Sequence, residues 1–385
     1  MSIKKRVMFV FGTRPEAIKL APVINEIKKH PDVFELLIVV TGQHRHMLDQ
    51  VLRVFDIKPD YDMGIMEEGQ TIQNVVSKVL RGLEGIILRE KPDIVLVQGD
   101  TSTAFAASLS AFYRKVPVGH VEAGLRTWDK YRPFPEEMNR KLTTSLADIH
   151  FAPTSTSVKN LKNEGVPLVS IYLTGNTVID ALFDVAKKDF DLRRVGLDLT
   201  AGKKVVLVTT HRRESFGQPL KAICSAVREI AQKHLDDAKF VIPVHKNPSV
   251  RDVIFDELSG LKNVELIEPL EYEPFVHLMK ASYLILTDSG GIQEEAPSLG
   301  KPVMVLREVT ERPEGVSAGV VKLVGVKTES IIEACEKLLC DRSEYDKMAC
   351  KKNPYGDGLA SQRVVSALLH YFGMIDRRPL EFSFS

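Results

Sequence analysis

Short runs of continuously apolar residues recur along the chain, with helical stretches between them. The runs in the first half are Val7–Phe11, Leu36–Val40, Ile94–Val97, Val116–Val121 and Ile149–Phe151. Those in the second half are Val205–Thr209, Lys239–Pro243, Val264–Ile267, Leu284–Leu286 and Val303–Leu306. A run without polar alternation predicts a strand that is covered on both faces, so we expect parallel sheets with helices on either side.

The strand pattern stops and restarts once, around a polar stretch from Asp180 to Ala201. This break predicts two Rossmann-like, doubly wound α/β domains that face a cleft, one of residues 1–180 and one of residues 181–365. Such sheets bind ligands beyond the carboxyl ends of their strands. The loops that follow the apolar runs are therefore the expected positions of functional residues.

Composition narrows the possible partners. The chain has 385 residues, of which 44% are hydrophobic and 27% charged, and its formal net charge is +1. This balance offers no electrostatic basis for binding nucleic acid or an anionic membrane. No apolar run approaches the roughly 20 residues of a membrane span, and the basic start of the chain leads into a first strand rather than a signal peptide. The four cysteines form no CxxC pair, which favours reduced thiols in a cytoplasmic enzyme.

A glycine-rich loop follows the run Leu284–Leu286. We expect a tight turn at Asp288–Gly291, then a short helix over Ile292–Leu299 that Gly300 ends. The glycines let the backbone approach a ligand, and the N–H groups at the start of a helix suit a phosphate. The residues alone equally allow a plain connection between a strand and a helix.

Charged side chains also follow the first strands of the first half. Arg14 and Lys19 can bind a phosphate or a carboxylate, or can be surface residues on a helix start. Asp100, after Ile94–Val97, is either a helix N-cap or a catalytic carboxylate.

Two more carboxylates, Glu122 and Glu136, lie in the segment after Val116–Val121. Charged residues directly after buried strands need partners or a function. The alternative to a catalytic role is a buried ion-pair network in which Arg126 and Arg140 neutralise these two glutamates.

In the second half, His211 stands beside two arginines at the end of Val205–Thr209. Neighbouring cations disfavour protonation, and a neutral imidazole can hydrogen-bond a phosphate or sugar oxygen. Phe275 can pack on a nucleobase or belong to the core. No HExxH or other metal-ligand spacing stands out and no GxGxxG follows a strand, so we expect neither a metal ion nor a redox cofactor. Together these residues indicate acid–base chemistry on a nucleotide sugar.

Taken in order, the motifs resemble those of the non-hydrolysing UDP-N-acetylglucosamine 2-epimerases. The resemblance covers roughly residues 5–372 and rests on Phe11-Gly-Thr-Arg14-Pro-Glu-Ala-Ile-Lys19, Gln98-Gly-Asp100-Thr, His120-Val-Glu122-Ala-Gly-Leu-Arg126, Pro135-Glu136-Glu-Met-Asn-Arg140, Thr210-His211-Arg-Arg-Glu214 and Asp288-Ser289-Gly-Gly-Ile-Gln-Glu-Glu295-Ala-Pro-Ser-Leu-Gly-Lys-Pro302. It implies the glycosyltransferase-B architecture, with residues 366–385 packing back on the first domain. It also implies a cytoplasmic homodimer that needs no cofactor and converts UDP-GlcNAc reversibly to UDP-ManNAc for cell-surface polysaccharide.

The resemblance implies a mechanism and a set of residues. Breaking the bond between C1 and UDP acidifies the C2 hydrogen, so UDP is eliminated, 2-acetamidoglucal forms, and UDP adds again after protonation of the other face, with water excluded. Proton transfer falls to Asp100, Glu122 and Glu136, and His211 stabilises departing UDP or assists the acid–base work. The UDP-binding set is Arg14, Lys19, Phe275, Ser289, Gly290, Gly291, Glu295 and Arg312. In this set the serine and the glycines hold the diphosphate and Glu295 the ribose.

Many bacterial relatives bind a second UDP-GlcNAc as an activator beside the active site. Gln43 and Gln70 match that allosteric site, and His245 is a further candidate. His46 and Gly69 stand where Gln and Arg are usual, so the resemblance leaves activation by substrate open. Leu270 also replaces a frequent Gln, a change that only a backbone contact would survive.

Other functions fit the same residues. A glycosyltransferase of the same architecture would need an acceptor pocket and usually lacks the three carboxylates. A hydrolysing epimerase would release free ManNAc and UDP, and a sugar-nucleotide sensor would function without turnover.

Overall fold

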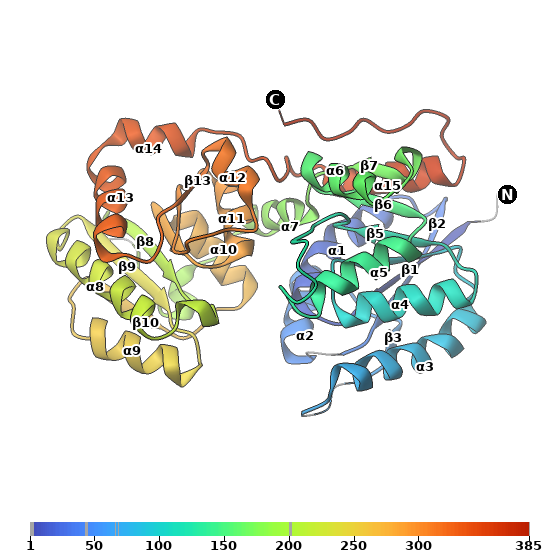
Figure 1. Cartoon of the computed structure of the whole chain (residues 1–385), viewed down its shortest axis with the longest axis horizontal. Coiled ribbons are helices and arrows are strands. Elements are labelled where there is room, and N and C mark those ends of the chain that lie inside the picture. Colours follow the sequence, from blue (N-terminus) through green and yellow to red (C-terminus); the bar gives the residue numbers. More distant parts are fainter. Residues whose placement is uncertain (1–3, 43–44, 66, 68, 200–201, 385) are drawn as a thin grey trace. The chain divides into compact units, whose positions relative to one another are not determined.

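The chain forms two compact units in a computed structural model that describes residues 4–42, 45–65, 67, 69–199 and 202–384 (Figure 1). Unit 1 consists of Met1–Asp184 and Gly356–Ser383, and unit 2 of Val185–Tyr355. The chain therefore crosses between units at 184/185 and 355/356, where the sequence places the boundaries at 180/181 and 365/366. Among the described residues, no helix is long and apolar enough to span a bilayer.

Unit 1 is built on a seven-stranded parallel sheet in the order β3-β2-β1-β4-β5-β6-β7. Its strands are β1 (Lys5–Phe11), β2 (Phe34–Val40), β3 (Tyr61–Asp62), β4 (Ile94–Gln98), β5 (Val118–Val121), β6 (Ile149–Ala152) and β7 (Ile171–Leu173). Its helices are α1 (Arg14–Ile27), α2 (Arg45–Val54), α3 (Ile72–Glu90), α4 (Ser102–Tyr113), α5 (Glu136–Leu146), α6 (Ser155–Asn163), α7 (Thr177–Ala186), whose last two residues belong to unit 2, and α15 (Ala360–Tyr371).

Unit 2 has a six-stranded parallel sheet in the order β10-β9-β8-β11-β12-β13. Its strands are β8 (Lys204–Thr209), β9 (Ala238–Pro243), β10 (Val264–Ile267), β11 (Leu284–Thr287), β12 (Val303–Val305) and β13 (Val321–Leu323). Its helices are α8 (Gln218–Lys233), α9 (Pro248–Leu258), α10 (Tyr272–Ala281), α11 (Gly290–Glu295), α12 (Pro313–Ala318), α13 (Thr328–Cys340) and α14 (Arg342–Ala349).

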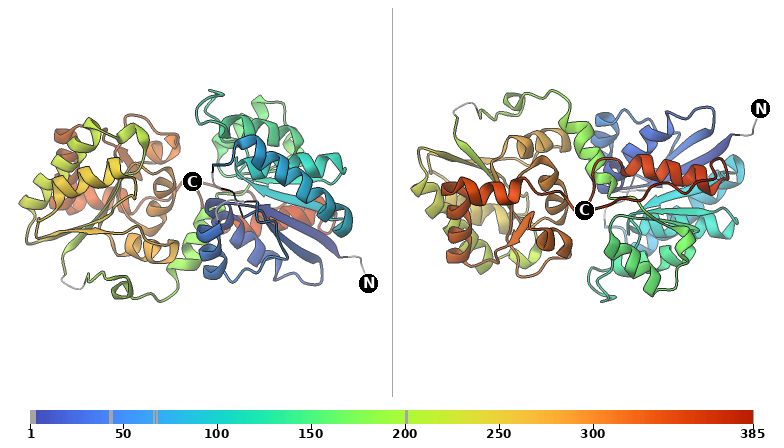
Figure 2. Two further views of the ribbon diagram at one scale, coloured as in Figure 1. Left: turned by 90° about the horizontal axis from the view of Figure 1, so that it is seen from below. Right: turned by 90° about the horizontal axis from the view of Figure 1, so that it is seen from above.

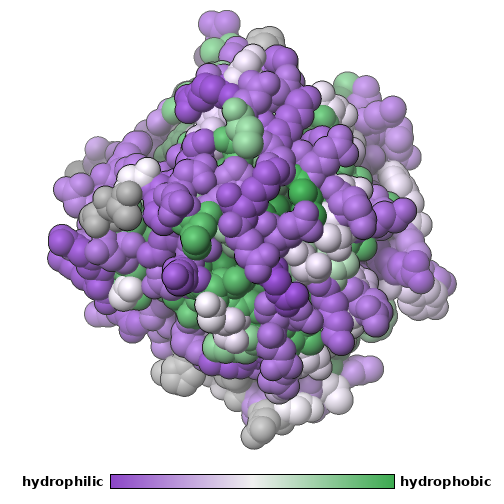
Figure 3. All heavy atoms as spheres, turned by 90° about the vertical axis from the view of Figure 1, so that its left-hand side faces the viewer, coloured by the Kyte–Doolittle hydropathy of each residue, from purple (hydrophilic) through white to green (hydrophobic). Residues whose placement is uncertain are grey.

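Each unit buries its apolar strands against helices. In unit 1, Val95 and Val97 of β4 share a buried cluster with Val79 and Leu83 of α3. In unit 2 the strand residues Val206, Phe240 and Leu286 form the corresponding cluster with α8 and α13. The face of unit 2 seen in Figure 3 is mostly hydrophilic, with apolar side chains in small patches between polar ones. Every residue of β4 and of β11 is buried, so the prediction of parallel sheets covered on both faces is confirmed.

The sequence misses β3, β7 and β13, which have two or three residues each and lie at edges of their sheets. Edge strands pair on one side only, so they need no long apolar run. The structure also corrects the predicted turn at Asp288–Gly291. Ser289 is the N-cap and α11 begins at Gly290, followed by a 3-10 helix, Ala296–Leu299, that Gly300 ends with φ +67°.

The returning C-terminal segment is anchored on unit 1. One carboxylate oxygen of Asp180, in α7, accepts hydrogen bonds from the backbone N–H and the hydroxyl of Ser361 at 2.7 and 2.6 Å. The other accepts from the backbone N–H of Ala360 at 3.2 Å, so Asp180 serves the otherwise unpaired start of α15. Figure 2 shows α15 in red alongside the elements of unit 1.

Candidate active site

In each parallel sheet there is one pair of neighbouring strands from which the chain builds the sheet outward in opposite directions. Candidate residues follow both strands of that pair. In unit 1 the strand pair is β1 and β4, whose carboxyl ends lead to Arg14 and Asp100. In unit 2 it is β8 and β11, which lead to His211 and Ser289. Ligands of open parallel sheets bind at such points, so the topology brings distant parts of the sequence together at each one.

Glu122 is the most constrained carboxylate of unit 1. Nζ of Lys19 lies 2.7 and 2.5 Å from its two oxygens, the amide of Asn176 donates to Oε1 at 3.2 Å, and the amide of Gln98 donates to Oε2. The backbone of Glu122 has φ +65°, a left-handed conformation that costs a residue with a Cβ about 1–3 kcal/mol. The fold therefore holds this buried carboxylate in one place at a cost in strain.

Asp100 is held from two directions by α5. Nε and one terminal nitrogen of Arg140 donate to Oδ2 of Asp100 at 2.9 and 2.8 Å, and the amide of Asn139 donates to its backbone oxygen at 2.9 Å. The N-cap of α4 is Thr101, whose hydroxyl accepts from the backbone N–H of Ala104. The N-cap interpretation of Asp100 is therefore wrong, and its partly exposed carboxylate faces Arg140.

Glu136 and Arg14 differ from these two. Glu136 is the first residue of α5, Arg14 the first residue of α1, and both are half-buried. Within the part of the chain that the structure describes, neither side chain forms a hydrogen bond or an ion pair. Both charged groups belong to helices of unit 1 and retain the capacity to bind another molecule.

The ion-pair network predicted as the alternative exists, but with other partners. Arg126 pairs with Glu164 through Nε at 2.8 Å and a terminal nitrogen at 2.6 Å, and Arg140 pairs with Asp100 and Glu137. Among the described residues, the acids that these two arginines contact are therefore Glu164, Asp100 and Glu137 in place of the predicted Glu122 and Glu136. Lys19, expected at a phosphate or a carboxylate, contacts the carboxylate of Glu122.

Sequence reasoning passed over two buried acids that support this edge of unit 1. Glu16 accepts hydrogen bonds from the backbone N–H groups of Gly12 and Thr13 at 3.0 and 2.8 Å and from the hydroxyl of Thr101 at 2.6 Å. Burial raises the pKa of its carboxyl group. Glu137 accepts from the backbone at 127 and 128 and pairs with Arg140. Only its i, i+3 spacing from Arg140 could have indicated this role.

In unit 2, Asp288 is fully buried and orients His211. Nδ1 of His211 lies 3.1 Å from Oδ1, the backbone N–H groups of His211 and Arg212 donate to Oδ2 at 2.9 Å each, and the hydroxyl of Ser215 donates at 3.1 Å. Burial alone would raise the pKa of the Asp288 carboxyl, but the contacts with His211 and Arg212 lower it below its ordinary value. The carboxylate thus takes the Nδ1 side of the imidazole and leaves Nε2 for another partner.

The first residue of α11 borders a space lined by two guanidinium groups. A Cβ built on Gly290 would lie 3.6 Å from a terminal nitrogen of Arg212 and 3.7 Å from the guanidinium carbon of Arg312. Arg312 also forms an ion pair with the buried Glu294 through Nε. The absence of a side chain at Gly290 therefore leaves room for an anion between two cations, as a phosphate requires.

The remaining predicted nucleotide-binding residues also belong to unit 2. Glu295 is buried and accepts a hydrogen bond from the hydroxyl of Tyr272 at 3.0 Å through Oε1. Its Oε2 lies 3.8 Å from a Cβ built on Gly291, next to the same turn. Phe275 on α10 is half-buried.

The three candidate allosteric residues are divided between the units. Gln43 lies outside the described residues. Gln70 belongs to unit 1, and its buried Oε1 has no hydrogen-bond partner among the residues that the structure describes. His245 of unit 2 is exposed, and its ring stacks on that of His211 with centroids 6.3 Å apart.

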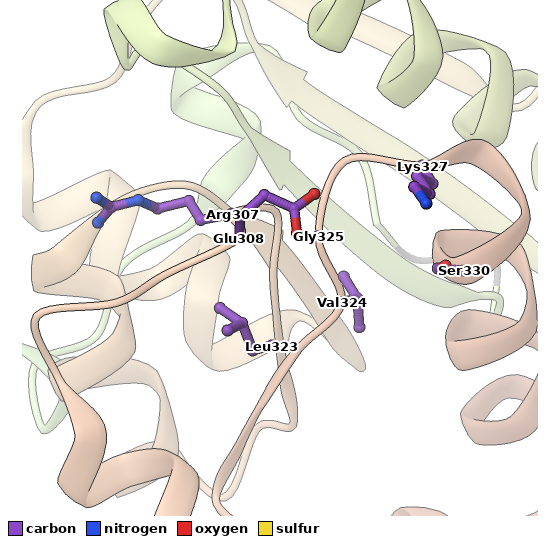
Figure 4. Close-up of a pocket in the computed structure, with 7 residues that line it drawn as sticks. All are labelled: Arg307, Glu308, Leu323, Val324, Gly325, Lys327 and Ser330. Carbon is purple, nitrogen blue, oxygen red and sulfur yellow. The ribbon is translucent and has the colours of Figure 1, made fainter.

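A separate shallow pocket of unit 2 is lined by Arg307, Glu308, Leu323, Val324, Gly325, Lys327 and Ser330 (Figure 4). None of these is among the predicted nucleotide-binding residues. The carboxylate of Glu308 points over Gly325, 3.0 Å from where a Cβ would be. The anion-binding position is therefore defined by Gly290 and its two arginines rather than by this pocket.

Comparisons with known proteins agree on one family. The family model described as UDP-N-acetylglucosamine 2-epimerase matches residues 25–369. The chain is 53% identical to the UDP-N-acetylglucosamine 2-epimerase of Escherichia coli K12 over 370 residues, which cover 94% of this chain and 98% of that protein.

Solved structures show the same likeness. The UDP-GlcNAc 2-epimerase from Neisseria meningitidis bound to UDP-GlcNAc has a TM-score of 0.84 and 51% identity, covering 94% of this chain and 99% of that chain. The glycotransferase of kitacinnamycin has a TM-score of 0.61 at 12% identity, covering 90% and 94%, which shows a shared fold alone. With the two parallel-sheet domains, this confirms the glycosyltransferase-B fold class.

Proposed function

This chain belongs to the UDP-N-acetylglucosamine 2-epimerase family and is an epimerase, and we propose that it interconverts UDP-GlcNAc and UDP-ManNAc by eliminating and re-adding UDP. The observation that supports this mechanism is that the two units carry different kinds of functional residues. Unit 2 has a cation-lined position for a diphosphate at Gly290, and unit 1 has carboxylates at the carboxyl ends of β4 and β5.

In unit 2 the chemistry is that of a leaving group. Arg212 and Arg312 neutralise the diphosphate beside Ser289 and Gly290, which favours cleavage of the bond between C1 and UDP. His211, held by Asp288 through Nδ1, directs Nε2 to the departing oxygen. Glu295 accepts hydrogen bonds from ribose hydroxyls, and Phe275 packs on the base. Retention of UDP matters because the same molecule must add again.

In unit 1 the chemistry is proton transfer at C2. Loss of UDP leaves positive charge at C1, which acidifies the C2 hydrogen, and its removal gives 2-acetamidoglucal. Asp100 and Glu122 are fixed by Arg140 and Lys19, as proton transfer over a short distance requires. Protonation of the opposite face by another member of the set Asp100, Glu122 and Glu136 inverts C2.

The product is a ManNAc donor for surface polysaccharide. The proposed reaction can be tested in deuterated water. Incubation of the protein with UDP-GlcNAc alone should yield UDP-ManNAc, and both epimers should carry deuterium at C2. Proton NMR measures both changes. A glycosyltransferase would form neither product, and a hydrolysing enzyme would release free ManNAc. The absence of both deuterium at C2 and UDP-ManNAc would contradict the proposal.

Gly290→Ala should weaken UDP binding by about 10- to 100-fold, the equivalent of one charge-assisted hydrogen bond. The added methyl group meets no atom closer than 3.6 Å, so the variant should fold, but it fills the space between the two guanidinium groups. Calorimetric titration with UDP measures the loss. Gly85→Ala in α3, where a Cβ meets nothing within 4 Å, is the matched control. Equal UDP affinity in the two variants would show that the diphosphate does not bind beside Gly290.

Asp288→Asn should lower turnover by about 100-fold and shift the pH profile of kcat, because the imidazole loses the group that fixes its Nδ1 hydrogen. KM should change little. Ser215→Ala removes another donor to the same carboxylate and leaves the imidazole contact intact, so it serves as the control. If Asp288→Asn lowers stability but leaves the pH profile of kcat unchanged, the role of Asp288 is structural.

Two features remain proposals that rest on the resemblance. We propose that a second UDP-GlcNAc binds to Gln43, Gln70 and His245, supported by the oxygen of Gln70 that has no hydrogen-bond partner within the described part of the chain. We also propose a homodimer, supported by exposed Leu88, Phe112 and Tyr113 on and beside α3 and α4 of unit 1. A sigmoidal dependence of the rate on UDP-GlcNAc concentration would indicate the second UDP-GlcNAc site. Analytical ultracentrifugation measures the oligomeric state.

A further inference from the structure

A histidine, a glutamate and a cysteine meet at the ends of two helices of unit 2. His234 is the C-cap of α8, and Glu336 and Cys340 lie one turn apart on α13. Their donor atoms all lie within 4.8 Å of one another. Nε2 of His234 is 3.1 Å from Oε1 of Glu336, and Sγ of Cys340 is 3.8 Å from Oε2.

Asp237 contacts the other ring nitrogen of His234. Both of its carboxylate oxygens lie 3.1 Å from Nδ1 of the buried His234. Carboxylates that accept a hydrogen bond from Nδ1 orient the histidines that bind metal ions through Nε2. Nε2 then faces an oxygen of Glu336 at 3.1 Å, and either a second proton on the imidazole or a metal ion can occupy the position between these two atoms.

The donor set is that of zinc. Imidazole nitrogen, thiolate and carboxylate are all common zinc ligands, and the two negative charges balance a divalent ion. Cys340 is exposed, so the ion has access. Nζ of Lys233 lies 2.6 Å from Oε2 of Glu336, but this side chain is 63% exposed and can turn into solvent when a metal ion binds.

The cluster lies apart from the candidate active site by topology. His234 and Asp237 precede β9, and Cys340 ends α13, so these residues lie where the strands of the sheet begin. His211 and Ser289 follow the carboxyl ends of β8 and β11, at the opposite edge. An ion here would join α8 to α13 without touching the nucleotide sugar.

We propose that this cluster binds one zinc ion through Nε2 of His234, a carboxylate oxygen of Glu336 and Sγ of Cys340, with water in the fourth position. No short sequence spacing indicates the site, because the tertiary packing of α13 on α8 brings the ligands together. The bound ion stabilises the two helix ends.

Titration of the full chain with Zn²⁺ against a chromophoric chelator tests the site, with Co²⁺ as a spectroscopic probe of the thiolate. We expect one Zn²⁺ per chain, a higher Tm, and thiolate-to-cobalt charge-transfer absorption. Cys340→Ser should abolish that absorption and weaken zinc binding by at least about tenfold, and Asp237→Asn should weaken it by about 10- to 100-fold. Mg²⁺, which prefers oxygen ligands, should produce none of these effects.

Cys350→Ser is the matched control, because Cys350 is also an exposed free cysteine of unit 2 and belongs to no such cluster among the described residues. It should leave zinc binding unchanged. Because Cys340 is exposed, Cys340→Ser should fold even if His234→Gln does not. Absence of zinc binding, or binding that Cys340→Ser and Asp237→Asn leave intact, would overturn the proposal.

Discussion

Asp100→Asn is expected to lower turnover of UDP-GlcNAc by about 10²- to 10⁴-fold, the usual contribution of one acid–base group, and to leave UDP affinity unchanged. The amide still accepts a hydrogen bond from Arg140, which now donates to Oδ2 at 2.9 and 2.8 Å, so the loop should keep its shape. It cannot take up a proton from C2. The nucleotide-binding residues of unit 2 are untouched, so calorimetry with UDP should match the wild type while NMR detects little UDP-ManNAc.

Asp93→Asn is the matched control for this variant. Asp93 directly precedes β4, the strand after which Asp100 follows, and it too is ion-paired, with Lys5 at 2.9 Å. It lies at the edge of the sheet where the strands begin, so its replacement should leave turnover intact. Near-normal turnover by Asp100→Asn would support a sugar-nucleotide sensor or a purely structural aspartate.

Glu122→Gln is expected to reduce turnover by a similar factor, about 10²- to 10⁴-fold. Its strained φ of +65° and its contacts with Lys19, Gln98 and Asn176 place one carboxylate with little freedom to move. Glutamine preserves the shape and removes the basic oxygen. Lys19 loses this ion pair, so thermal unfolding must be measured beside the rate to separate chemistry from stability.

The intermediate distinguishes the roles of the two carboxylates. Supplied with UDP and 2-acetamidoglucal, the wild type should form both epimers. A variant that lacks the acid of one face should form only the other epimer, so Asp100→Asn and Glu122→Gln should differ in product. Glu90→Gln is the control, since Glu90 precedes β4 and accepts from the hydroxyl of Tyr61 at 2.6 Å. Identical product mixtures from all variants would contradict a division of the two faces.

The sequence predicts the strands well where burial on both faces demands a continuous apolar run, as in β1, β4, β8 and β11. It predicts the edge strands poorly, because β3, β7 and β13 are short and pair on one side. Around Gly290 it indicates a phosphate-binding loop, but it places the start of the helix two residues late. Local patterns record burial and turn chemistry, and these were sufficient for fold class and for the positions of the loops.

The two parallel-sheet domains, the family resemblance and the residue types at the carboxyl ends of the strands could all be predicted from the sequence. Which charges meet depends on the tertiary packing. Lys19 reaches Glu122 across 103 residues, Arg140 reaches Asp100 across 40, and His211 reaches Asp288 across 77. The physical reason is that strand order places loops from remote segments side by side, and no local periodicity encodes which side chains then pair.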